Sequence, residues 1–421
     1  MFSNYVESGP VLMSSADAKL HADFRLTKTN VTIANTLRRS ILVHTPSVGF
    51  RTEPYEKSDV LISVNTTPLV NEMVAHRIGM IPININPFTD PVEADKEFDP
   101  KLYTFELDVE NAGKTIVDVR AADFKVYRRD PENPLNAPTL LDTALFFPPD
   151  PITGDTLLIT RLRPQWNPTA PKERIQLRAK ARVSSGEENS RWSPVSQASY
   201  EYTRDSDEEH IEGVFNTWLA RYKKVVDPST LDVGKKAELK REFDTMEIQR
   251  CYITDESGNP NDFTFHVESV GIQPIPEIVY GALVACTGRL MRYQDIDSLV
   301  PDTVRIQEGD CNFAAIDVYF QNETHTLGNM LETWIVDNMG KDELADITYV
   351  GYKIPHPLRP EMMIRIGVKE GMDVDIQKTA VRRAIAAACR ALKEDFHRML
   401  GSWNGLTRLV VTEEGLMDEI D

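Results

Sequence analysis

Two twelve-residue segments of this chain are similar to each other, and this internal repeat constrains the fold more than any other feature. Placing residues 30–41 over residues 324–335, an offset of 294 positions, gives four identical residues in twelve. The matches pair Thr32 with Thr326, Asn35 with Asn329, Leu37 with Leu331, and Ile41 with Ile335. In both places an alternating, strand-like run comes first and residues with helical spacing follow.

The two halves of the chain also end alike. Each closes with an amphipathic helix pattern, at residues 274–292 and at residues 374–400. An apolar helix face must be buried, and two similar modules achieve this by packing face against face. We therefore predict an α+β fold in which two related modules form an intramolecular pseudo-dimer with approximate two-fold symmetry. Chance similarity is the competing explanation for the repeat.

Changes in composition along the chain suggest where the modules begin and end. Of the 26 prolines, 15 fall in residues 51–179, where the apolar runs are short, so we predict an inserted, loop-rich β domain there. The predicted segments are 1–50, first part of module 1; 51–179, insert; 180–300, second part of module 1; 301–310, linker; 311–404, module 2; and 405–421, an acidic tail, which we expect to be mobile from Val411 onward.

A charged excursion at residues 203–262 interrupts the second part of module 1 and contains one strong helix pattern. Ser206 and Glu209 have the spacing of a capping box. The apolar face that follows consists of Ile211, Phe215, Trp218, Leu219 and Tyr222. Two interpretations remain open: this helix packs on its own domain, or it binds a partner.

Charge and cysteine content limit the classes of function. The net charge of −18 repels polyanions, so protein partners are favoured over direct contact with nucleic acid. The sequence has no apolar run of about 18 residues that would span a membrane, and residues 1–13 lack the pattern of a secretory signal. The four cysteines are far apart, which argues against disulfides and a cysteine metal site. We expect an intracellular chain without cofactors or metals.

Several long motifs resemble one protein family. The segments TNVTIANTLRRSI at residues 29–41 and VNEMVAHRIGMIP at residues 70–82 closely resemble the signature of the RNA polymerase assembly subunits, which include the bacterial alpha subunit, the archaeal D subunit and the third subunit of eukaryotic polymerase II. FHVESVG at residues 265–271 is similar to the segment at which the chain of that family returns to the dimerisation domain. ETHTLGNML at residues 323–331 and YKIPHP at residues 352–357 resemble the smaller partner, the archaeal L or eukaryotic eleventh subunit.

The resemblance implies a fused, non-catalytic scaffold that dimerises within one chain and then receives the second-largest and largest polymerase subunits, with small subunits as further partners. DNA would be met only through the complex. Arg38 and Arg39 lie off the apolar stripe of their helix, where either an ordinary solvated face or a contact with carboxylates or carbonyls of another chain is expected. The resemblance implies that their guanidinium groups contact the second-largest subunit. His76 and Arg77 either face a neighbouring subunit or make local contacts. The predicted interface residues are Asn35, Arg38, Arg39, His76, Arg77, Thr326, Leu327, Asn329, Leu331, Leu392 and Phe396.

One departure from the family concerns metal binding. Many relatives carry a cysteine cluster in or near the insert, whereas residues 51–179 contain no cysteine, so we predict no metal there. A catalytic polymerase subunit needs clustered aspartates, and the pairs Asp373/Asp375 and Asp295/Asp297 fall at predicted helix ends, where acidic caps are ordinary. Neither a P-loop nor a GxSxG or HExxH motif occurs. The sequence therefore favours a non-catalytic chain.

A stand-alone transcription regulator that uses the same fold is the alternative function. Fused versions of the two subunits are familiar in large DNA viruses, so the resemblance suggests a viral source. A viral factory in the host cytoplasm, the virion and, as an alternative, the nucleus all suit a reduced, acidic chain.

Overall fold

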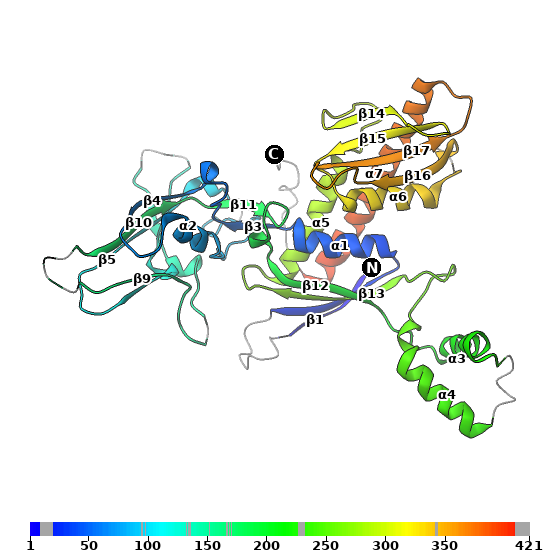
Figure 1. Ribbon diagram of the computed structural model, residues 1–421, viewed down its shortest axis with the longest axis horizontal. Coiled ribbons are helices and arrows are strands. Elements are labelled where there is room, and N and C mark those ends of the chain that lie inside the picture. The colour runs from blue at the N-terminus through cyan, green and yellow to red at the C-terminus, as the bar shows by residue number, and fades with distance from the viewer. Residues whose placement is uncertain are drawn as a thin grey trace.

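The structure, a computed structural model, places two packed α+β modules at the centre of the molecule, with a β-rich domain on one side and a helical arm on the other (Figure 1). The described residues are 1–8, 20–93, 96, 98–131, 133, 136–150, 152–165, 167, 169, 171–225, 232–341 and 344–408. The predicted mobile tail from Val411 lies outside them. No helix among these residues is both long and apolar enough to cross a membrane.

The first module is a four-stranded antiparallel sheet covered on one face by two helices. The sheet has the order β1-β2-β13-β12, and its strands are β1 (Phe2–Ser8), β2 (His21–Thr27), β12 (Val195–Tyr202) and β13 (Asp262–Ser269). Alternation along β2 buries Ala22, Phe24 and Leu26 beneath α1 (Val31–Val43) and α5 (Ile275–Met291). The period-2 and period-3.6 patterns therefore predicted β2, β12, β13, α1 and α5, whereas the edge strand β1 was not predicted.

The second module repeats this arrangement. Its sheet has the order β14-β15-β17-β16, formed by β14 (Val304–Glu308), β15 (Ala315–Gln321), β16 (Ile347–Lys353) and β17 (Glu361–Val368), with helices α6 (His325–Asn338) and α7 (Val374–Thr407). The interpretation of residues 301–310 as a linker is wrong, because Val304–Glu308 pair with β15 as the edge strand. The strand is short, and three of its five residues, Arg305, Gln307 and Glu308, are polar or charged, so it looked like a connection.

The two modules share a single hydrophobic core, in which α5 packs against α7 and α1 against α6. The helix α7 is longer than predicted and reaches back across the first module. Near its end Trp403 is fully buried and packs edge-on against Phe2 and Phe24, while its Nε1 donates to the Pro276 carbonyl at 2.9 Å. The pairing predicted from the internal repeat is thus present within one chain.

The inserted domain has a separate hydrophobic core. Its five-stranded sheet has the order β4-β10-β5-β7-β8, and β6 and β9 form a separate two-stranded sheet. The elements of the domain are β4 (Val60–Asn65), α2 (Asn71–Gly79), β5 (Tyr103–Asn111), β6 (Val117–Arg120), β7 (Lys125–Arg128), β8 (Thr139–Leu141), β9 (Leu158–Leu162) and β10 (Glu173–Ala179). β3 (Pro46–Gly49) and β11 (Arg182–Ser185) pair at the connection to module 1. We keep 51–179 as the proposed extent of the insert; its core also includes Val48, Phe50 and Ala181.

Short helical turns complete the structure. The 3₁₀ turns are η1 (Tyr55–Lys57), η2 (Pro100–Leu102), η3 (Ala121–Asp123), η4 (Thr143–Leu145), η5 (Ser190–Trp192) and η8 (Ile248–Arg250), and η6 (Leu219–Lys223) is a π turn.

The charged excursion forms an arm with two helices rather than one. Helix α3 (Glu208–Trp218) packs on α4 (Val233–Met246) around Phe215, Trp218 and Phe243. The predicted cap is wrong, because the carboxylate of Asp207, and not the hydroxyl of Ser206, accepts from the Glu209 amide at 3.0 Å. Tyr222 leaves the predicted buried face and is 57% exposed, since the π turn shifts the register of the stripe.

Candidate subunit interfaces

The crossing of α1 and α6 carries the clearest sign of two-fold pairing. Arg39 Nε donates to Thr326 Oγ1 at 3.0 Å, and Thr32 Oγ1 lies 3.0 Å from Thr333 Oγ1. Adding the repeat offset of 294 turns Thr32 into Thr326 and Arg39 into Thr333. The same two positions therefore meet twice, once in each direction, as an isologous interface requires.

The helix caps repeat at the same offset. Asn30 caps α1 by accepting from the Ile33 amide, and Thr324, which lies 294 positions later, caps α6 by accepting from the Thr326 amide. The internal repeat therefore includes the side-chain N-cap of each helix as well as the identical residues.

The arginine residues of α1 are less available than the sequence suggested. Arg39 already uses its Nε for the hydrogen bond to Thr326 of α6, which lies across α1. Arg38 donates from Nε and Nη2 to the side chain of Asn35 at 3.1 and 3.0 Å, and both residues are half-buried. Both guanidinium groups are thus positioned by contacts within the chain, and a contact of either with another subunit stays a prediction.

Most predicted interface residues of module 2 lie inside the molecule. Thr326, Leu327 and Leu331 of α6 are buried, as are Leu392 and Phe396 of α7, and the four apolar side chains belong to the shared core. Asn329 is half-buried. These residues stabilise the pairing of the two modules, and the buried ones are not accessible to a further chain.

A polar network that the sequence did not predict crosses the module boundary. Arg289 of α5 donates from Nη2 to Glu187 at 2.9 Å, and its Nη1 lies 3.3 Å from the carboxylate of Glu323. Tyr293 donates its hydroxyl to Glu323 at 3.0 Å. Burial raises the pKa of the Glu323 carboxyl, whose side chain is 2% exposed, against the lowering effect of Arg289.

His44 borders this network as a neutral side chain. Burial, followed by the charges of Arg289 and Arg39, lowers the pKa of His44 to about 3. Its Nε2 lies 3.8 Å from the Glu187 carboxylate, but a neutral imidazole makes no ion pair there. The only hint in the sequence to this network was the ETHTLGNML motif, which begins with Glu323.

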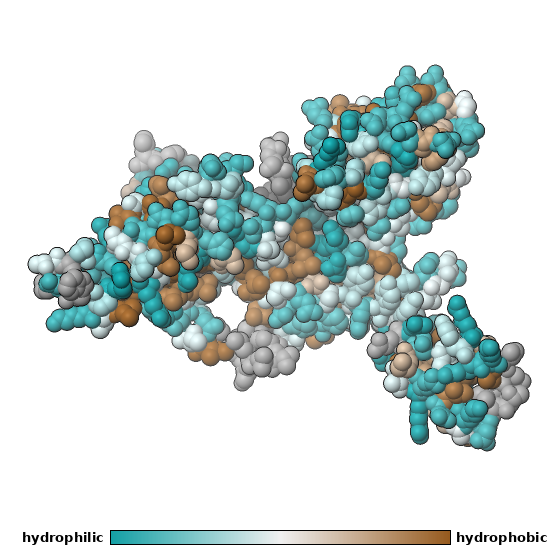
Figure 2. All heavy atoms as spheres, viewed as in Figure 1, coloured by the Kyte–Doolittle hydropathy of each residue, from teal (hydrophilic) through white to brown (hydrophobic). Residues whose placement is uncertain are grey.

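An exposed surface lies on the inserted domain, around α2 (Figure 1). Val74 and Ile78 are fully buried, as predicted, whereas His76 and Arg77 are exposed and Arg77 donates to the Leu158 carbonyl at 2.9 Å. The exposed apolar side chains are Val70 at 58%, Met73 at 55% and Met80 at 57%, with Leu61 of the adjacent β4 at 69%. Figure 2 shows hydrophobic side chains gathered on the visible face of the inserted domain in this region.

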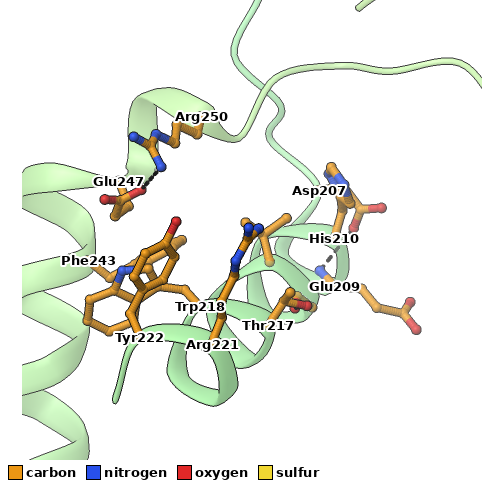
Figure 3. A pocket seen from close by; sticks show the side chains of 12 residues that line it. Asp207, Glu209, His210, Thr217, Trp218, Arg221, Tyr222, Phe243, Glu247 and Arg250 are labelled. Carbon is orange, nitrogen blue, oxygen red and sulfur yellow. Dashed lines mark hydrogen bonds and ion pairs between the residues drawn. The ribbon is translucent and has the colours of Figure 1, made fainter. Parts of the chain in front are cut away.

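The arm contains a hollow of about 740 Å³. Trp218, Tyr222 and Phe243 lie on one side of it in Figure 3, with the Glu247–Arg250 ion pair above them. His210, on the other side, is bound to Asp205 at 2.7 Å. This mixture of aromatic rings and paired charges provides neither a nucleophile with an adjacent base nor an arrangement for two metal ions.

The two aspartate pairs considered for catalysis have structural roles. Asp373 caps α7 by accepting from the Asp375 amide, as predicted. Asp297 lies after α5 and accepts two hydrogen bonds from Arg390 of α7 at 2.8 and 2.9 Å, with Asp295 3.6 Å from the same guanidinium. Each pair therefore stabilises a helix end or the α5–α7 contact.

Two α+β modules paired through their helices in one polypeptide define a dimerisation scaffold. The chain belongs to the RNA polymerase Rpb3/Rpb11 dimerisation domain family, which matches it over residues 23–285 and, in a second family of the same description, over residues 315–402. It is similar to the RNA polymerase II subunit RPB3 of Schizosaccharomyces pombe, with 27% identity over 69% of this chain and 89% of the relative.

Two further relatives agree. Subunit 3 of RNA polymerases II, IV and V of Arabidopsis thaliana is 26% identical over 72% of this chain and 93% of its own length. The subunit Rpo3 of Pyrococcus horikoshii is 26% identical over 62% of this chain and 87% of its own length. These findings support a non-catalytic polymerase assembly subunit rather than a stand-alone regulator.

Proposed function

We propose that this chain nucleates assembly of a multisubunit DNA-directed RNA polymerase by receiving the second-largest and then the largest catalytic subunit, together with small subunits. One observation carries the proposal: the helix faces of both modules are already buried in a shared core within one polypeptide. The chain therefore needs no dimerisation partner before it binds other subunits. With a net charge of −18, it meets DNA only through the complex.

The first contact surface in this proposal is the exposed side of α2. Large apolar side chains that remain exposed beside charged ones mark interaction sites more often than scattered single residues do. Val70, Met73 and Met80 follow one another at helical spacing, with the exposed His76 and Arg77 between them. We assign this surface to the second-largest subunit.

Helix α1 supplies a second, smaller contact. Arg38 is pre-positioned by its two hydrogen bonds to Asn35 and keeps a partly exposed guanidinium. A planar guanidinium held in this way is suited to carboxylates or carbonyl groups of a partner. The remaining predicted residues act through pairing of the modules.

The test is purification of the tagged full-length chain from its native source, with mass spectrometry and promoter-independent RNA synthesis as measurements. The main variant is Met73→Glu/Met80→Glu, which places charges on an exposed surface without opening the core. Its matched control is Val233→Glu/Met246→Glu, because these arm residues are 83% and 72% exposed on another helix. Arg38→Glu tests α1 separately.

We expect the wild type and the arm control to bring down two very large subunits with RNA synthesis activity, and the α2 variant to lose both. A polymerase-free wild-type chain would contradict the scaffold itself. Equal recovery of the large subunits by the α2 variant would contradict only the assignment of the surface.

A viral source is part of the proposal. Both dimerisation domains occur in one polypeptide, an arrangement that resembles the fused subunits of large DNA viruses. In that case the chain works in a viral factory of the host cytoplasm or is packaged in the virion, and a nuclear location is the alternative. Fractionation of infected cells with an antibody against this chain distinguishes these locations.

A further inference from the structure

The outer face of the first module's sheet brings two histidines and an aspartate together. His21 and Asp23 are two residues apart on β2, so their side chains share a face, and Asp23 is directly opposite His266 of β13 in the strand register. His21 Nε2 lies 3.0 Å and His266 Nδ1 lies 2.6 Å from the same oxygen, Oδ1 of Asp23. The two imidazole rings are nearly parallel, 6.4 Å apart.

We propose that His21, Asp23 and His266 bind a divalent transition-metal ion of the zinc class. The three ligand atoms lie within 4.8 Å of one another, a separation that one ion can bridge after small side-chain rotations. Two imidazole nitrogens with one carboxylate oxygen favour Zn²⁺, Ni²⁺ or Cu²⁺ over Mg²⁺ and Ca²⁺, which prefer oxygen ligands. This inference goes beyond the assembly function and does not depend on it.

The surroundings favour a cation. Glu201 of β12 lies 3.9 Å from Nε2 of His266, on the ring edge away from Asp23, where an outer carboxylate can orient a metal-binding imidazole. Glu268 lies opposite His21 in the register and adds negative charge. The nearby cation Arg25 is held by a bidentate pair with Asp262, at 2.7 and 2.9 Å.

Access and rigidity also fit a binding site. The side chains of His21, Asp23 and His266 are 34%, 45% and 33% exposed, so an ion and its remaining water ligands can reach them. All three residues lie in hydrogen-bonded strands near the centre of the sheet, which limits the movement needed for coordination. The alternative explanation of the same contacts is that the three side chains only hydrogen-bond to one another and bind no ion.

The test uses the full-length chain carrying Cys311→Ser, because Cys311 is a partly exposed thiol and thiolates are ligands for soft metals. The protein is stripped with EDTA and titrated with Zn²⁺ by calorimetry and with Co²⁺ by visible absorption. We expect one saturable site whose affinity falls at least about 10-fold in His21→Ala, His266→Ala and the nearly isosteric Asp23→Asn. His397→Ala removes an exposed histidine of α7 and serves as the matched control.

Affinity should also decrease as the pH is lowered, because a protonated imidazole cannot coordinate the ion. Circular dichroism and thermal unfolding of each variant test whether the sheet is retained. Loss of binding by a variant with wild-type spectra and unfolding then reports the loss of a metal ligand. Absence of a saturable site, or a site whose affinity is unchanged in His21→Ala/His266→Ala, overturns the proposal. The same variants are also tested for co-purification of the large polymerase subunits. If those subunits are still recovered, a loss of metal binding is independent of the assembly function.

Discussion

Arg289 and Glu323 face each other across the boundary between the two modules, with the guanidinium 3.3 Å from the carboxylate. One residue lies in the last helix of module 1 and the other in the turn that opens α6. Their side chains are 12% and 2% exposed, so solvent screens the pair little. Removing one partner of such a buried pair lowers the stability of the fold, because the other side chain is left charged and buried without its counter-ion.

Glu323→Gln should therefore destabilise the paired modules by about 2–4 kcal/mol, because Arg289 stays buried with one carboxylate fewer. Urea unfolding of the full-length chain measures this change. The double variant Arg289→Met/Glu323→Gln should lose clearly less than the sum of the two single variants. Additive losses would show that the two side chains are not coupled.

His44 predicts a specific dependence of stability on pH. Its folded-state pKa of about 3 lies below the unfolded value near 6.5, so the unfolded chain takes up a proton first as the pH falls. The contribution of neutral His44 is fully present above about pH 6.5 and is lost by up to ~1.4 kcal/mol per pH unit on the way to pH 3. Urea unfolding at pH 7, 5 and 4 should show the wild type losing stability relative to His44→Gln. A constant difference between the two proteins would contradict the assignment.

Gly328 predicts a steric requirement in module 2. A Cβ at this position of α6 would lie 2.4 Å from the ring of Tyr352 on β16, whereas the position 294 residues earlier, Ala34, already carries a methyl group. Gly328→Ala should cost about 1–3 kcal/mol through overpacking. Tyr352→Val in the same chain should recover much of that loss. Thermal unfolding is the measurement, and a Gly328→Ala protein as stable as the wild type would disprove the contact.

Trp403 should anchor the end of α7 to module 1. Trp403→Ala removes a fully buried indole and its hydrogen bond to Pro276, so we expect a loss of about 3–5 kcal/mol and faster proteolysis near the end of α7. Leu358→Ala, at a position that is 88% exposed, is the control and should leave both measurements unchanged. Proteolysis at the wild-type rate in Trp403→Ala would show that α7 is held elsewhere.

Elements with a long, regular pattern were predictable from the sequence. The β2–α1 and β15–α6 units follow a clear change of period. Burial alternates along β2 as this pattern predicts, whereas β15 buries the four consecutive residues 315–318. Helix α4 was missed because Phe243 is the one side chain that it buries fully among its described residues, so it has almost no apolar stripe. The edge strand β14 was missed for a similar reason, since it is short and has only two apolar residues, Val304 and Ile306.

Side-chain contacts between distant segments could not be predicted from the sequence. Nothing local distinguishes Arg39 from Arg38, yet the crossing of α6 occupies Arg39 and leaves Arg38 with its helix neighbour Asn35. His266 lies 243 positions from Asp23, and only the register of β2 against β13 brings them together. The availability of such groups depends on packing that a periodic pattern does not encode.

The continuous chain from Met291, the end of α5, to Val304, the start of β14, makes the meeting of the two modules a unimolecular event. Its rate therefore does not change with the amount of protein in the cell, in contrast to the encounter of two separate polypeptides. A tethered partner also outcompetes pairing between identical modules at low abundance. Because one polypeptide contains both modules, they are always made in a one-to-one ratio, with no excess of either.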